Sequence, residues 1–312
     1  MFGKSILSFS KLLRMRLLCV LVCTTQMISL SISAHAQAPT PRPEGLKGVS
    51  TPTNPEETEQ TLNELKLTAH IFGEAKPLTA GLVWRVFHDQ DQTTMIVAHS
   101  DEAQPRFRLQ SGTYLVHVSF GYASATRRIN VRTTAQTEKL LITAGALKLA
   151  AAIGETPISA AKVSFSIYVP IGSNSEGRLV LKDVKTGDVI RLPEGNYHVV
   201  SQYGDSNSIM RSDLKIENSK VTEATLNHRA ATVTVKLVTS LGSEALAGTA
   251  FSVLTPGGDV VREVIGAFPQ MVLSEGDYVL IARHDGQVYT RDFKVQTGND
   301  REIEVEAKII PN

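Results

Sequence analysis

The segment Gly204–Asn207, which spells Gly-Asp-Ser-Asn, contains the sequence's best candidate for a catalytic serine. A Gly-Asp-Ser segment can supply the nucleophile of a hydrolase. That chemistry needs the serine at a strand-to-helix turn, with a base and oxyanion donors around it. Here the segment lies between two runs of β type, and no helical pattern follows. Because the same residues are typical of tight turns, we predict a hairpin turn and no catalytic residue.

The densest group of possible metal ligands is His88, Asp89 and Asp91, followed by His99 and Asp101. Their spacing matches no zinc signature, and the Asp-x-Asp segment lacks the glycine and glutamate of a calcium loop. We therefore predict a solvated hairpin, with no metal and no cofactor bound.

The other histidines are scattered through the chain. His117 and His198 each stand an odd number of residues from a tyrosine in a β-type run, which places them on the opposite strand face from that tyrosine. We expect both to be exposed surface residues.

Trp84 is the single tryptophan. An exposed tryptophan can stack on a sugar ring, but Phe165 and Phe251 occupy the equivalent place in two similar segments, and large aromatic residues usually fill sandwich cores. We predict that Trp84 is a core residue.

Glu302, Glu304 and Glu306 alternate along one segment, so that they share one face of a strand. Carboxylates on one strand do not flank a substrate as an acid/base pair must. Charges on an edge strand oppose sheet-to-sheet association, and we assign that role to the three glutamates.

An internal repeat of about 80 residues must position all these groups. The segments LQSGTYLVHVSFG, LPEGNYHVVSQYG and LSEGDYVLIARHDG share the pattern Leu-x-x-Gly-x-Tyr. Their tyrosines, Tyr114, Tyr197 and Tyr278, are 83 and 81 residues apart. A second marker, which contains Trp84, Phe165 and Phe251, precedes each segment and recurs after 81 and 86 residues.

The repeated Leu-x-x-Gly-x-Tyr motif predicts a structural corner. We expect its glycines to adopt positive φ at a tight turn, and each tyrosine to place its ring in the core while its hydroxyl bonds back to the backbone of the corner. The corner residues are Gly112, Tyr114, Gly195, Tyr197, Gly276 and Tyr278.

Each repeat divides into short runs that alternate apolar and polar residues, with Gly, Asn, Asp and Pro between them. The third repeat has seven such runs, and no helical stripe follows the first 36 residues. This pattern predicts an all-β protein made of three tandem seven-stranded antiparallel sandwiches of immunoglobulin-like or prealbumin-like type.

The motif also resembles that of a known class of domains. The segment LPEGNY is similar to the L-P-x-G-x-Y segment of carboxypeptidase-regulatory-like and prealbumin-like β-sandwich domains, while LQSGTY and LSEGDY lack the proline. The repeats also resemble those of uncharacterised exported Gram-negative bacterial proteins. The resemblance spans roughly residues 62–310 and implies a fold but no active site.

The first 36 residues have the composition of a cleavable signal peptide. Lys4, Lys11, Arg14 and Arg16 precede an apolar run of about 14 residues, shorter than the roughly 20 that span a bilayer. Ala34 and Ala36 form the A-x-A pattern that places cleavage after Ala36, and translation can start at Met1 or Met15.

Cleavage would remove Cys19 and Cys23, leaving a mature chain with no thiol or disulfide. It would also lower the net charge from +1 to −3, a value that gives no reason to expect nucleic acid binding. The predicted divisions are a signal peptide (1–36), a Pro-, Thr- and Glu-rich disordered leader (37–61) and three sandwich repeats (62–143, 144–229 and 230–312).

Two functional classes follow from the sequence. The first is an exported, non-catalytic binding or structural module of the periplasm or cell surface, whose partner is an envelope protein or polysaccharide that the sequence does not identify. The alternative is a hydrolase or metal-dependent enzyme with its site in a cleft between repeats. The mature chain is expected to have no transmembrane segment.

The joins between the predicted repeats are short. No Pro- or Ser-rich spacer separates the first two repeats, and only His228 and Arg229 separate the second from the third. Few free dihedrals remain in such joins, so we predict a semi-rigid rod of roughly 100 Å, on the basis of about 3.3 Å per strand residue.

Overall fold

The structure is a computed structural model that describes residues 62–90, 93–132 and 135–308. These residues form strands and turns only, which confirms the predicted all-β fold. None of the described residues belongs to a helix long and apolar enough to cross a membrane. The predicted signal peptide, the leader and Asp91 lie outside the described residues.

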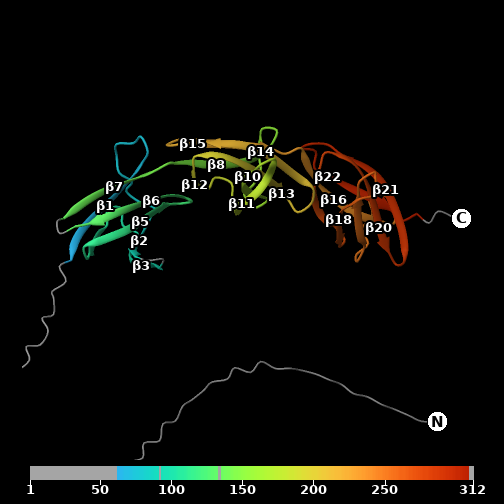
Figure 1. Cartoon of the computed structure of the whole chain (residues 1–312). Helices are drawn as coiled ribbons and strands as arrows, with labels where there is room; N and C mark the ends of the chain where they lie inside the picture. The colour runs from blue at the N-terminus through green and yellow to red at the C-terminus, as the bar shows by residue number, and fades with distance from the viewer. Residues whose placement is uncertain (1–61, 91–92, 133–134, 309–312) are drawn as a thin grey trace, which may run out of the picture. The chain divides into compact units, whose positions relative to one another are not determined.

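The first sandwich packs a three-stranded sheet of order β4-β1-β7 against a four-stranded sheet of order β3-β2-β5-β6 (Figure 1). Its strands are β1 (Asn63–Ile71), β2 (Leu82–Gln90), β3 (Thr93–Ser100), β4 (Arg106–Leu109), β5 (Gly112–Phe120), β6 (Ala123–Val131) and β7 (Gln136–Ile142).

The second sandwich repeats this arrangement with sheets of order β12-β8-β15 and β11-β10-β13-β14, and the short β9 pairs with β8. Its strands are β8 (Ala144–Ile153), β9 (Thr156–Pro157), β10 (Val163–Ile171), β11 (Asn174–Val184), β12 (Val189–Pro193), β13 (Gly195–Tyr203), β14 (Ser208–Ile216) and β15 (Val221–Asn227).

The third sandwich has sheets of order β19-β16-β22 and β18-β17-β20-β21. Its strands are β16 (Ala230–Val238), β17 (Ala250–Leu254), β18 (Val260–Ile265), β19 (Gln270–Ser274), β20 (Gly276–His284), β21 (Gln287–Val295) and β22 (Arg301–Glu306).

One strand pair in each of the sheets β4-β1-β7, β12-β8-β15 and β19-β16-β22 is parallel, a detail that the alternation of residues did not reveal. The first and last long strands of each sandwich lie side by side and run the same way, as β1 with β7, β8 with β15 and β16 with β22. Parallel strands need a crossover, and the chain makes it by returning from the four-stranded sheet to the other layer. The remaining pairs of strands are antiparallel.

Alternating side chains from both sheets fill three separate cores, because successive residues of a strand point to opposite faces. Trp84, Phe165 and Phe251 are among the largest buried side chains, each at most 1% exposed, so their predicted place in the core is confirmed. The indole nitrogen of Trp84 donates a hydrogen bond to the carbonyl of Glu102 at 3.0 Å.

The three cores follow one another with almost no intervening chain. β7 ends at Ile142 and β8 begins at Ala144, while only His228 and Arg229 separate β15 from β16. Val272, from the third predicted repeat, packs in the core of the second sandwich. The predicted repeat boundaries remain a proposal.

Candidate functional site: docking turns at the sandwich junctions

The segment Gly204–Asn207 forms the turn between β13 and β14, as the sequence indicated. The sequence did not indicate that this turn contacts the third sandwich. The Asn207 side chain donates a hydrogen bond to the Tyr278 hydroxyl at 2.8 Å and accepts one from the Ser274 backbone N–H at 3.0 Å. The Ser274 hydroxyl in turn donates to the Asn207 carbonyl at 2.9 Å. A single turn residue thus ties β13–β14 to the corner of the next sandwich.

Close backbone approach at this junction requires a glycine. Gly204 has φ 71°, and a Cβ built on it would lie 2.7 Å from the Cβ of Val272. Such a contact is too short for any side chain, so Gly204 lets the turn reach strand β19. Beside it, the Asp205 carboxylate pairs with the Arg262 guanidinium on β18.

The first junction uses the equivalent turn. Gly121, between β5 and β6, has φ 63°, and a Cβ there would lie 2.8 Å from the Cβ of Arg191 on β12. The next residue, Tyr122, donates its backbone N–H to the Arg191 carbonyl at 2.9 Å. The Arg191 guanidinium lies 4.5 Å from the centre of the Phe120 ring, a cation–π distance.

A second contact supports the first junction from the opposite direction. The Asn218 side chain donates to the Phe72 carbonyl at 2.7 Å and accepts from the Ala144 backbone N–H at 3.1 Å. The Ser219 hydroxyl bonds the Glu74 carboxylate. Both residues belong to the turn before β15, so each of the two sandwiches contributes one turn that contacts the other.

A buried histidine occupies the short join between the second and third sandwiches. His228 is 1% exposed, and its two ring nitrogens each lie 2.8 Å from a serine hydroxyl, that of Ser201 and that of Ser208. Burial lowers the pKa of His228 to about 4, so the ring is neutral at physiological pH. Both serines are at most 2% exposed. A substrate cannot reach this Ser–His pair, whose hydrogen bonds instead fix the join to β13 and β14.

A cleft of about 440 Å³ lies beside the second junction, between the second and third sandwiches. Charged and polar side chains from both sandwiches line it, among them Lys162, Asp183, Lys185, Gln202 and Gln270. It is the place where the enzyme alternative would need its catalytic groups.

The three motif tyrosines lie in similar surroundings. Tyr114, Tyr197 and Tyr278 are 3–5% exposed, and burial raises the pKa of each. Their hydroxyls donate to the carbonyls of Gln110, Pro193 and Ser274 at 3.0, 3.0 and 2.9 Å. Each bond closes the corner four residues upstream.

The expected positive φ is found at two of the three motif glycines, but all three open a strand and none lies within a tight turn. Gly112, Gly195 and Gly276 open strands β5, β13 and β20. Gly195 and Gly276 have positive φ, of 158° and 159°, whereas Gly112 does not. A Cβ on any of the three would be in ordinary contact with the ring of the following tyrosine, so this glycine packs beside the ring, next to the corner that the tyrosine hydroxyl closes.

The candidate metal ligands that the structure describes are not brought together. Asp89 pairs with Arg128 at 2.6 Å, and the His88 ring packs edge-on against Tyr114. Within the described ranges, no group of three or more His, Cys, Asp or Glu side chains is placed to hold a metal ion.

The expected exposure of His198 is wrong. It does face away from the core side, but it is 6% exposed, and its Nδ1 lies 2.6 Å from Asp213. His117 is half-buried, and burial together with the nearby Arg85 lowers its pKa. Strand parity predicted the face of each residue but not whether that face is covered.

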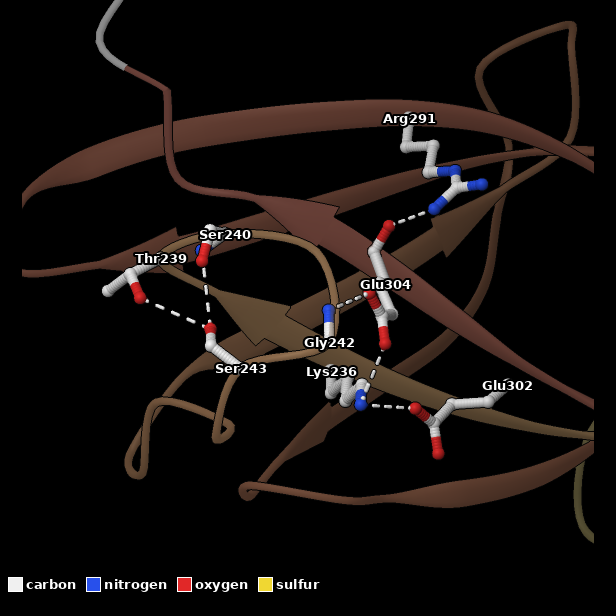
Figure 2. Close-up of polar contacts among 8 residues, drawn as sticks. All are labelled: Lys236, Thr239, Ser240, Gly242, Ser243, Arg291, Glu302 and Glu304. Atoms are coloured by element: carbon white, nitrogen blue, oxygen red, sulfur yellow. Dashed lines mark hydrogen bonds and ion pairs between the residues drawn. The ribbon is translucent and has the colours of Figure 1, made fainter.

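Two of the alternating glutamates bind the same lysine. Figure 2 shows Lys236 of β16 reaching Glu302 and Glu304 of the neighbouring β22, with Nζ 2.8 Å from Glu304. Hydrogen bonds to Glu302 and Glu304 raise the pKa of Lys236. The second Glu304 oxygen accepts the backbone N–H of Gly242 at 2.9 Å, and Arg291 bonds the Glu304 carbonyl (Figure 2). These carboxylates hold β22 to its own sandwich, and their role as edge guards stays a proposal.

Comparison with known proteins gives one family match and several distant structural similarities. The model of the Rhizobiales growth-associated tandem repeat domain matches residues 232–307, which lie in the third sandwich. Among curated proteins, no relative matches the sequence.

Three solved structures illustrate the structural similarities. The Bacillus anthracis TIE protein is 19% identical over 80% of this chain, with a TM-score of 0.25. This chain spans about half of that protein, 51% of its length. A streptococcal ancillary pilin is 13% identical over 79% of this chain and 99% of its own, with a TM-score of 0.29. The minor pilin GBS52 of Streptococcus agalactiae is 13% identical over 53% and 95%, with a TM-score of 0.27.

The docking glycine can be tested with a matched pair of variants. Gly204→Ala should lower the free energy of unfolding by about 1–3 kcal/mol, the usual cost of overpacking, because its methyl group meets Val272. Gly172 has a similar φ of 58° with open space around it, so Gly172→Ala carries the backbone strain without the clash. Denaturant titration compares the two, and equal losses would contradict a docking role for Gly204.

Proposed function

We propose that this chain is an exported, non-catalytic module of the bacterial periplasm or cell surface, and that it holds its tandem sandwiches in a preferred orientation to bind an envelope protein or polysaccharide. One observation carries the proposal. At both junctions a hairpin turn with a left-handed glycine docks on the next sandwich. Domains on flexible linkers do not need such contacts.

Catalysis is the weaker reading of the same surfaces. The Ser201–His228 pair is sealed in the join, and Asp205 in the cleft is neutralised by Arg262. The side chains at the junctions make contacts between sandwiches, which suits a scaffold or an extended binding surface. The similarity to carboxypeptidase-regulatory-like domains supports the same reading and belongs to the proposal.

The proposal is tested by affinity capture from an envelope extract with residues 37–312 as bait. A binding module should retain its partner in a fixed ratio and leave it chemically unchanged, as mass spectrometry before and after incubation would show. Cleavage of the captured component that disappears in the Asp183→Asn or Asp205→Asn variant would instead establish the enzyme alternative in the cleft.

Export has its own prediction. The protein from the envelope fraction should begin at or near Gln37, because the basic, apolar and A-x-A segments end there. N-terminal sequencing checks this. Recovery of a membrane-bound chain that still begins at Met1 or Met15 would contradict cleavage.

The fixed orientation of the sandwiches also has a direct readout. NMR relaxation of the backbone amides should give one common tumbling time for the three sandwiches, because docked turns restrict the joins. In the Gly204→Ala variant the third sandwich should tumble with a separate, shorter time. Separate tumbling in the unsubstituted chain would contradict the proposal.

A further inference from the structure

Each sandwich has a turn after its motif strand and an edge strand before its motif. In the described contacts between sandwiches, two of the turns dock on two of these edge strands. The docking turns follow the same strand in each repeat, and the strands that receive them, β12 and β19, precede the Leu-x-x-Gly-x-Tyr motif. The equivalent strand of the first sandwich is β4. Within the described part of the chain, no sandwich precedes β4 to dock on it.

β4 shares structural features with β12 and β19, the two strands that receive a docking turn. It is the edge strand of its sheet, as β12 and β19 are. Arg108 directly precedes the motif leucine, as Arg191 does in β12. In the antiparallel register, Arg108 lies opposite Glu64 of β1, just as Arg191 lies opposite Ala146 of β8. Because the register is the same, the Arg108 carbonyl points away from the sheet, as the Arg191 carbonyl does. The outward Arg191 carbonyl accepts the backbone N–H of Tyr122. Arg108 is exposed.

The chain's own third turn does not fit this strand. Asp285 stands at the position of Gly121 and Gly204 and shares their left-handed backbone, with φ 46°. At the two occupied junctions, a Cβ on Gly121 or Gly204 would lie only 2.8 or 2.7 Å from the receiving strand. In the same docking geometry, the Cβ of Asp285 would make the same clash. Steric exclusion at Asp285 therefore disfavours end-to-end docking of a second copy through this turn.

We propose that β4 is an open docking edge that receives a hairpin turn from another β-sandwich protein, and that this turn carries an aromatic residue followed by glycine. The two occupied junctions define this chemistry. Phe120 precedes Gly121 and Tyr203 precedes Gly204, and the guanidinium of Arg191 packs on the ring of Phe120. The glycine permits backbone contact, and Arg108 supplies both the outward carbonyl and the cation above the ring. The inference rests on the proposed binding function and specifies one of its surfaces.

The probe for this site is a cyclic hairpin peptide of residues 116–127, which contains the turn that docks on Arg191. It is titrated into the isotope-labelled chain of residues 37–312, and backbone amide shifts are followed by NMR. The amides of Arg106–Leu109 should shift and saturate, since β12 and β19 are already occupied. A peptide with Gly121→Val should bind at least about tenfold more weakly, by loss of close approach, and Arg108→Glu in the chain should abolish the shifts.

Two outcomes would overturn the proposal. One is the absence of shifts in β4 at millimolar peptide, and the other is equal binding of the Gly121→Val peptide. Arg108 is exposed, so its replacement leaves the fold intact as a control. If the peptide titration fails but an envelope partner is captured, only the proposal about β4 is contradicted. If both experiments fail, the proposed binding function is contradicted as well.

Discussion

Replacing Tyr197 with alanine is expected to lower the free energy of unfolding of the second sandwich by about 3–5 kcal/mol, the usual range for removing a buried aromatic ring. The Tyr197 ring is 4% exposed and packs in the same core as Phe165 and Leu192. Truncation also leaves the Pro193 carbonyl without its hydroxyl partner.

Tyr197→Phe separates the two causes, because it keeps the ring and removes only the hydrogen bond. Its expected cost is about 1 kcal/mol. Denaturant titration followed by amide NMR signals of each sandwich gives both values. Trp84 fluorescence reports the first sandwich, whose core is separate, and serves as the internal reference. A midpoint for Tyr197→Ala that matches the unsubstituted chain would show that the ring is not part of the stabilising core.

Acidification is expected to weaken the second sandwich and its join through His228. Burial holds the folded pKa of His228 at about 4, below its ordinary value of 6.5. Unfolding therefore favours proton uptake, so stability from this group is fully present above pH 6.5 and is lost as the pH falls from 6.5 towards 4. At 1.36 kcal/mol per pKa unit, the loss is at most about 3 kcal/mol.

His228→Gln is the control for this prediction, because an amide can still bond the two serines and does not titrate. The variant should lose most of the extra pH dependence between pH 6.5 and 4, as denaturant titrations at several pH values would show. The same slope in both proteins would assign the acid sensitivity to other groups and contradict a buried neutral His228.

The fold was predictable because the same short-range residue patterns recur in each repeat of the sequence. Alternation of apolar residues set the strands, and the recurrence of Trp84, Phe165 and Phe251 before each motif identified a shared core position. A large aromatic residue at an apolar position of an alternating run is usually buried in the core. The parallel pairing of first and last strands was not predictable, since alternation is the same for both strand directions.

The candidate site was only half visible in the sequence. Gly121 and Gly204 end the repeated motif, and Asp285 takes their place in the third repeat. That difference is a signal, yet its meaning depends on Arg191 and Val272, which are 70 and 68 residues away along the chain. Turn chemistry predicts a turn, and it does not say what the turn touches.

The sequence by itself determined the all-β class, the repeating succession of strands along the chain and the burial of the aromatic residues at each core position, because these follow from short-range periodicity. Tertiary structure alone decided which polar residues pair. It placed Asn207 against Tyr278 and sealed His228 between Ser201 and Ser208. It also covered the outer face that carries His198. Such contacts join segments far apart in the chain, and hydrogen bonds form between whichever groups the fold brings within reach.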